Sequence, residues 1–186
     1  SPHLESGQQY ALDPPPADGS KVVIADTDHI GGVLGSSEGT VYQQWIWKSL
    51  LRGLQPILMD SIQNGIPGWE GQAWNDTANP AFPIARKTLG YAGKFAEQLD
   101  LANLVPRSEL ASTSYCLANP GKAYVVYQPA SGPFSIDCQA GTYQCAWYDP
   151  FTDKEFPPYS LEVKDEQHEF TPPFAGPAVL SLVVRE

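Results

Sequence analysis

Residues 21–29 read KVVIADTDH, a short apolar run that ends in two carboxylates and an imidazole. Consecutive apolar residues rich in valine and isoleucine are typical of a strand buried on both faces, as in parallel sheets. In open α/β sheets and in α/β barrels, ligands bind at the carboxyl ends of such strands. The stretch therefore predicts a buried strand followed by a ligand-binding position at Asp26, Asp28 and His29.

The same order of elements repeats in the following residues. The apolar pattern predicts a helix over 41–53, a second buried strand over 56–60 that ends in Asp60, and a second helix over 84–101, whose apolar stripe begins at Ile84. A long connection, 61–83, joins the second strand to this helix, and connections of this length usually form lids or binding loops. Strand, helix, strand, helix is the pattern of two βα units.

The pattern changes near residue 105, beyond which short alternating runs recur between turns. Regular short strands with Asn-Pro-Gly, Ser-Gly-Pro and Asp-Pro turns predict an antiparallel β-sandwich of about eighty residues. The expected strands are 112–117, 123–128, 134–138, 143–148, 159–163, 169–170 and 178–184. Tyr124, Tyr127, Trp147 and Tyr148 alternate on these strands and are expected in the core. We therefore expect two domains, 1–104 and 105–186.

Composition narrows the classes of partner. The chain has 186 residues, a formal net charge of -10 and a pI of about 4.6, so nucleic acids and anionic membranes are not expected partners. It has no apolar run long enough to span a membrane, and residues 1–7 have no signal-peptide pattern, so the chain looks cut from a longer one. Cys116, Cys138 and Cys145 lack metal-type spacing. We expect them to be buried thiols. The alternative is a disulfide between Cys138 and Cys145 across a hairpin.

Several segments together resemble a known family. The matching stretches are 21–30, 45–53, 56–60, 110–121 and 146–150. In their order and spacing they resemble the carboxyl-terminal part of apiosidase-like glycoside hydrolases, which were once described as collagenases. These proteins have a (β/α)8 barrel followed by a β-sandwich labelled a collagen-binding domain. One departure is visible, because the family pattern has a Trp where Gly31 and Gly32 follow Ile30 here.

The resemblance implies a fold class of α/β plus all-β. The two βα units would be the last two of a (β/α)8 barrel, followed by the antiparallel β-sandwich. The missing N-terminal part of the barrel would then be a required partner, because a barrel closes only with all eight strands.

The resemblance also implies roles for the residues that follow the first strand. Glycosidases use two carboxyl groups that flank the scissile bond. In many barrel glycosidases the nucleophile ends the seventh strand, which makes Asp26 or Asp28 a candidate nucleophile or substrate-binding group. His29 would hydrogen-bond to sugar hydroxyls or to the neighbouring carboxylate. The alternative is structural, with Asp26 capping a helix or pairing with an arginine and His29 satisfied within the fold.

Three further residues are candidates for substrate binding. Asp60 ends the second strand, and Trp69 and Trp74 lie on the long connection, where their rings could stack on sugars or pack within a lid.

An Asp-x-Asp-His cluster, as at residues 26–29, can also hold a metal. No second group of His or Cys completes a ligand shell, so neither a metal nor a cofactor is expected.

The function expected from the sequence is the C-terminal portion of a glycoside hydrolase. It would act on plant or microbial polysaccharide by paired-carboxylate chemistry, would be secreted or periplasmic, and would be inactive alone. The alternative is a non-catalytic accessory module that binds a glycan or collagen.

Overall fold

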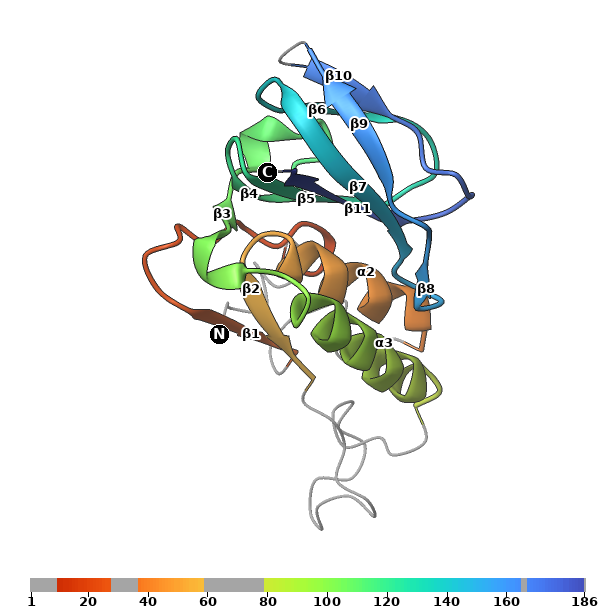
Figure 1. The fold of residues 1–186 in the computed structure, drawn as a ribbon. Coiled ribbons are helices and arrows are strands. Elements are labelled where there is room, and N and C mark those ends of the chain that lie inside the picture. The colour runs from red at the N-terminus through yellow and green to blue at the C-terminus, as the bar shows by residue number, and fades with distance from the viewer. Residues whose placement is uncertain (1–9, 28–36, 59–78, 165–166, 186) are drawn as a thin grey trace, which may run out of the picture.

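The computed structural model describes residues 10–27, 37–58, 79–164 and 167–185. Figure 1 shows a two-stranded sheet, a seven-stranded sheet and a pair of helices in successive layers, with a parallel strand pair beside the helices. The helices α2 (Gly39–Leu50) and α3 (Ala81–Ala96) are accompanied by short 3-10 turns η2 (Leu101–Asn103) and η3 (Ser108–Leu110), and residues 10–12 are also helical. The strands are β1 (Val23–Asp26), β2 (Leu54–Ile57), β3 (Val105–Pro106), β4 (Cys116–Asn119), β5 (Ala123–Gln128), β6 (Phe134–Asp137), β7 (Gly141–Asp149), β8 (Lys154–Glu155), β9 (Tyr159–Val163), β10 (Gln167–Phe170) and β11 (Ala178–Val184).

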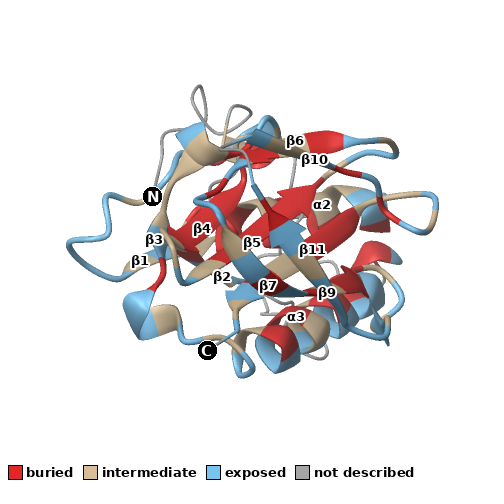
Figure 2. Ribbon diagram, turned by 45° about the horizontal axis from the view of Figure 1, so that its top comes forward, coloured by how far each residue is buried: buried red, intermediate tan, exposed pale blue. Residues whose placement is uncertain are grey.

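The seven-stranded sheet separates two hydrophobic cores. Its strands follow the order β3-β4-β5-β11-β7-β8, with β9 also paired to β7, and all its pairs are antiparallel. Side chains alternate across a strand, so in β11 Leu180 and Leu182 enter the core shared with β6 and β10. Val179 enters the other core, which is shared with α2 and α3 and is called the helix-side core below. Figure 2 shows the buried residues concentrated on these central strands and on α2.

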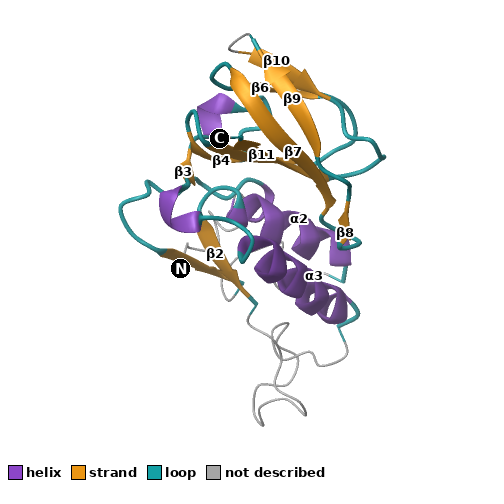
Figure 3. Ribbon diagram, in the orientation of Figure 1, coloured by secondary structure: helices purple, strands orange, loops and turns teal. Residues whose placement is uncertain are grey.

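The predicted fold class is wrong. The described chain is mostly antiparallel β-sheet with few helices, and no fragment of a (β/α)8 barrel is evident within it (Figure 3). β1 and β2 form a single parallel pair that runs from Val23 opposite Leu54 to Asp26 opposite Ile57. The physical reason is that α2 and α3 share a core with the antiparallel sheet, whereas barrel helices cover parallel strands.

The expectation that the first strand is buried on both faces is also wrong. Val22, just before β1, is 78% exposed, and Ile24 within β1 is 62% exposed. Ala25, on the opposite face of β1, packs against the helix-side core. An apolar run predicts a strand, but which of its faces are covered depends on neighbouring layers that the run itself does not specify.

Helix α2 is buried around most of its circumference. Its buried residues are Gly39, Tyr42, Gln43, Trp45, Ile46, Trp47, Ser49 and Leu50. A helix that is apolar on nearly all sides belongs in an interior. After α2 the chain turns at Gly53, whose φ of +76° favours glycine. A Cβ at Gly53 would also lie 2.6 Å from Cγ of Pro106, so a side chain there would push β3 away.

Trp47 is the point at which α2, α3 and the seven-stranded sheet meet. The centroid of its ring lies 5.6 Å from that of Phe95 on α3, 5.6 Å from that of Tyr148 on β7 and 6.4 Å from that of Tyr127 on β5. Its indole Nε1 donates a hydrogen bond of 3.0 Å to the carbonyl of Pro150. The ring is fully buried with its polar atom satisfied, as a core tryptophan requires.

Helix α3 buries a narrower stripe of residues than α2 does. Ala81, Phe82, Ala85, Thr88, Ala92 and Phe95 are its buried residues. Ile84, which the sequence pattern assigns to the apolar stripe, is instead 41% exposed. It lies against the start of α2, where a Cβ on Gly39 would be only 2.4 Å from Cδ1 of Ile84. The missing side chain of Gly39 therefore permits the close approach of the two helices.

The strands after residue 105 lie near their expected positions. β5, β9 and β11 occupy 123–128, 159–163 and 178–184, as the sequence predicts. Tyr124, Tyr127, Trp147 and Tyr148 are all buried, which confirms their prediction as core residues.

The helix-side core joins residues from both sides of position 105, and the division into domains 1–104 and 105–186 stays a prediction. In the described parts of the chain, no helix is long and apolar enough to cross a membrane.

We expect Trp47→Ala to lower the free energy of unfolding by about 3–5 kcal/mol, because it empties the volume shared by α2, α3 and the seven-stranded sheet. Urea denaturation followed by fluorescence and by circular dichroism measures this change. Glu97→Ala, a substitution at an exposed position just after α3, is the control and should change the free energy of unfolding by less than about 0.5 kcal/mol. A loss below about 1 kcal/mol for Trp47→Ala would contradict the central position given to this side chain.

The three cysteines are free thiols in the buried interior. Burial raises the pKa of Cys116 to about 12 and that of Cys145 to about 11, and it also raises the pKa of Cys138. Because the thiolate is the reactive form, we expect none of them to react with a thiol reagent at pH 8 in the native protein. All three should react in urea without reductant. A single reactive thiol in urea would instead show a disulfide between two of them.

Candidate functional site

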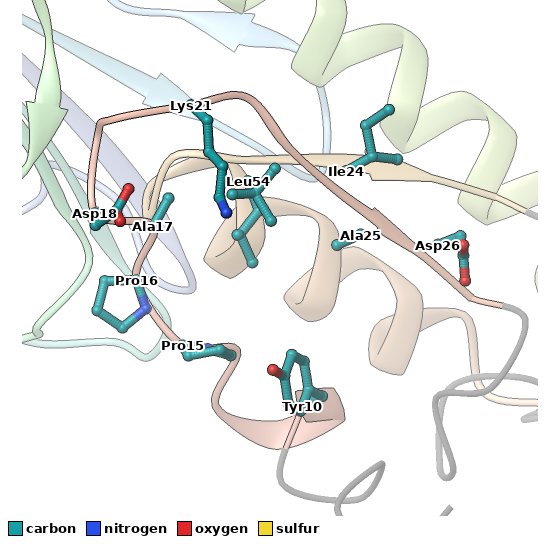
Figure 4. Close-up of a pocket in the computed structure, with 11 residues that line it drawn as sticks. Tyr10, Pro15, Pro16, Ala17, Asp18, Lys21, Ile24, Ala25, Asp26 and Leu54 are labelled. Atoms are coloured by element: carbon teal, nitrogen blue, oxygen red, sulfur yellow. The ribbon is translucent and has the colours of Figure 1, made fainter. Parts of the chain in front are cut away.

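A cavity of about 560 Å³ lies beside β1 and contains the one sequence-predicted site residue that the structure describes, Asp26. Its walls come from β1, from Leu54 of β2 and from the segment that precedes β1. The lining residues are Tyr10, Pro15, Pro16, Ala17, Asp18, Lys21, Val23, Ile24, Ala25, Asp26 and Leu54. Figure 4 shows Asp18 and Asp26 at opposite ends of the cavity, with Lys21 and Tyr10 between them. The volume is in the range of small-ligand sites.

Asp26 is placed by the pairing of β1 with β2. It is the last residue of β1, lies opposite Ile57, and is followed by Thr27, whose N–H donates to the carbonyl of Ile57 at 3.2 Å. Thr27 is fully buried, so the backbone on the carboxyl side of Asp26 is held in place. The half-buried Asp26 side chain is therefore carried at the carboxyl end of a parallel strand, where ligand-binding groups commonly stand.

The opposite wall is held by the side chain of Arg52, just after α2. The Arg52 guanidinium is 2.9 Å from the carboxylate of Asp13 and donates hydrogen bonds to the carbonyls of Pro14 and Ser114. It also lies over the ring of Tyr115, 4.5 Å from the centroid, and the Tyr115 hydroxyl donates to Asp13 at 2.8 Å. Arg52 thus joins three segments that are far apart in the sequence, and it fixes the residues that bound the cavity.

The two carboxylates of the cavity differ in their surroundings. Asp18 accepts hydrogen bonds from the backbone N–H and the hydroxyl of Ser20, at 2.9 and 2.7 Å. These bonds hold the pKa of Asp18 below its ordinary value and engage it in its own turn. Asp26, in contrast, is not part of such a turn and lies at the end of β1. A carboxylate, an ammonium and a phenol next to apolar proline and isoleucine side chains can hydrogen-bond to hydroxyl groups and pack against an apolar ring face.

Five of the sequence-predicted site residues lie outside the described residues. They are Asp28, His29, Asp60, Trp69 and Trp74. Asp26 alone is therefore located, and the catalytic or binding roles of all six residues stay predictions. Among the described residues, no three His, Cys, Asp or Glu side chains form a group that could hold a metal ion.

Sequence reasoning missed three polar residues of the cavity, Tyr10, Asp18 and Lys21. Lys21 opens the stretch that defines the first strand, but nothing in its local pattern marks it as a site residue. Tyr10 lines the cavity because the segment that follows it is held by Lys48, which donates to the carbonyl of Leu12 at 2.7 Å, and by Arg52. Such a long-range contact has no signal in a local pattern.

Several solved structures resemble this fold, and two of them are glycoside hydrolases. One is named a glycoside hydrolase and matches with a TM-score of 0.61 and 14% identity over 81% of this chain. The other is a glycoside hydrolase family 5 protein from Bacteroides vulgatus ATCC 8482, with a TM-score of 0.56 and 14% identity over 79% of this chain. The matches span 39% and 36% of the lengths of those proteins. The fold is therefore related to that of glycoside hydrolases, and at this identity the likeness concerns the fold alone.

No protein-family model and no curated protein matches the sequence. Membership of the apiosidase-like family and the collagen-binding label of the sandwich therefore remain predictions from the sequence.

We expect Arg52→Ala to loosen the wall of the cavity and to leave the rest of the fold intact. The Ala17 amide, which donates to the carbonyl of Arg52 at 2.8 Å, should exchange its hydrogen at least about tenfold faster, because its segment loses the guanidinium contacts. Arg107→Ala is the matched control, since Arg107 pairs with Glu109 two residues away. Equal exchange rates of Ala17 in both variants would contradict the role given to Arg52.

Proposed function

We propose that this chain is a portion of a glycoside hydrolase that cleaves plant or microbial polysaccharide, and that Asp26 lines its carbohydrate cleft. The observation that carries the proposal is the position of Asp26 at the carboxyl end of a parallel strand, facing a cavity, in a fold related to glycoside hydrolases. The resemblance seen in the sequence supports the same class. A secreted or periplasmic location is part of this proposal and rests on the resemblance.

The proposed chemistry uses Asp26 as one of two carboxyl groups. Glycosidases place an acid and a nucleophile or base about 5–10 Å apart across the scissile bond. Asp18 is a poor second group, because Ser20 already engages its carboxylate. Asp28 and His29, two and three residues beyond Asp26, are proposed to contribute to the same cleft. The proton donor would come from outside the described residues, and the isolated chain is therefore proposed to bind sugar without cleaving it.

In the enzyme that contains this chain, Asp26→Asn should lower kcat on a neutral polysaccharide by about 100-fold or more, because it removes a reacting carboxylate while keeping its shape. Release of reducing ends measures the rate. Asp18→Asn makes the same change of charge in the same cavity and should leave kcat within about twofold of the parent. If both variants lose activity equally, or neither does, Asp26 has no part in the chemistry.

A further inference from the structure

A groove lies on the seven-stranded sheet beside the end of α3, away from the cavity of Asp26. It consists of two cavities of about 430 and 380 Å³, which share Gln98 and Val183 as lining residues. We call this feature the α3 groove. None of its lining residues also lines the cavity of Asp26.

The α3 groove exists because α3 ends at Ala96 and leaves part of the sheet uncovered. Phe95, in the last turn of α3, packs on Tyr148 with ring centroids 4.9 Å apart and closes the helix-side core at this point. Beyond it, Val183 of β11 is 51% exposed. Val183 is on the face of β11 opposite to Leu182, which is buried between the sheets. The part of the groove around Val183 is thus aliphatic and partly open, whereas the other cavity is also lined by aromatic residues, which are Phe95, Trp147, Tyr148 and Phe156.

The α3 groove is lined by four neutral side-chain amides and by three charged residues, Asp100, Lys122 and Glu155. Gln98, Asn103, Asn119 and Gln144 are the side-chain amides that line it. Within the described chain, the side chains of Gln144 and Asn119 make no hydrogen bond to another residue, so their donors and acceptors are available to a ligand. The nearby carboxylates are already engaged, because Glu155 accepts from Gln98 at 3.2 Å and Asp100 accepts from Asn103 at 2.6 Å.

We propose that the α3 groove binds a neutral oligosaccharide, with sugar rings in the two adjoining cavities. A sugar presents apolar C–H faces that suit an apolar floor, and hydroxyls that both donate to and accept from side-chain amides. A polyanion is disfavoured by the net charge of -10. A proline-rich peptide is disfavoured because such peptides dock in grooves lined by exposed aromatic rings. Here Phe95, Trp147 and Tyr148 are buried, and the half-buried Phe156 already stacks on Phe174 with ring centroids 4.7 Å apart. The choice of a sugar rests on the proposed function, but the site does not use Asp26.

The test is a titration of the ¹⁵N-labelled chain with xylotetraose, cellotetraose and mannotetraose, followed by amide chemical shifts. At least one of them should shift the amides of 95–104 and 181–184, and the tetrasaccharide should bind more tightly than its disaccharide. Gln144→Ala should weaken this binding about fivefold, as expected when hydrogen bonds to a neutral ligand are lost. Gln167→Ala on β10 is the matched control and should leave it unchanged.

A second variant, Val183→Lys, places a long side chain on the floor of the groove and should abolish the shifts while the remaining spectrum stays folded. The proposal is overturned if none of the sugars at 10 mM shifts these amides, if the shifts fall on residues 10–26 instead, or if only a proline-rich peptide produces them. Failure of the α3 groove and failure of the proposed catalysis are thereby separated, because the first is read from sugar binding and the second from turnover.

Discussion

The burial of Trp47 is the constraint on which the rest of the structure depends. One indole ring contacts α3 through Phe95 and the antiparallel sheet through Tyr127 and Tyr148, so α2 cannot move without opening the helix-side core. Aromatic pairs at such distances contribute about 0.5–1.5 kcal/mol each beyond the burial of their area. The ring also holds the turn after β7 through its bond to the carbonyl of Pro150. The helices are therefore part of the same packed body as the sheet.

The position of α2 in turn determines the surroundings of Asp26. α2 is followed by Arg52, which is 7% exposed and satisfies its donors on Asp13, Pro14 and Ser114. A buried guanidinium tolerates few arrangements, because each unpaired donor would cost free energy. The segment before β1 is consequently held against the end of α2, and the cavity lies between this segment and β1. The site is thus a product of the helix layer as much as of the strand that carries its carboxylate.

The sequence predicted the local features of this fold better than their assembly. The ranges of β5, β9 and β11 follow from alternation between turn residues, which is a property of neighbouring positions. The burial of Tyr124 and Trp147 follows from the same alternation. The exposure of Ile24 and the barrel prediction show the limit, because both concern which layer covers a strand. The place of Asp26 at the end of a strand could be predicted because strand ends are marked locally, whereas Tyr10 lines the cavity through long-range contacts.

The helix layer also gives the α3 groove the rigidity that weak ligands need. Hydrogen bonds to a neutral ligand return little net free energy, so a site that must first order itself would lose much of its affinity. Here the end of α3 is fixed from two sides, by Phe95 on Tyr148 and by Lys94, whose ammonium lies 3.2 Å from the carboxylate of Asp153. Asp153 also accepts from the hydroxyl of Tyr148 at 2.8 Å, which orients the carboxylate toward the helix. The width of the groove is therefore set by contacts that are already present without a ligand. The packing of α2 and α3 thus positions both the cavity of Asp26 and the α3 groove.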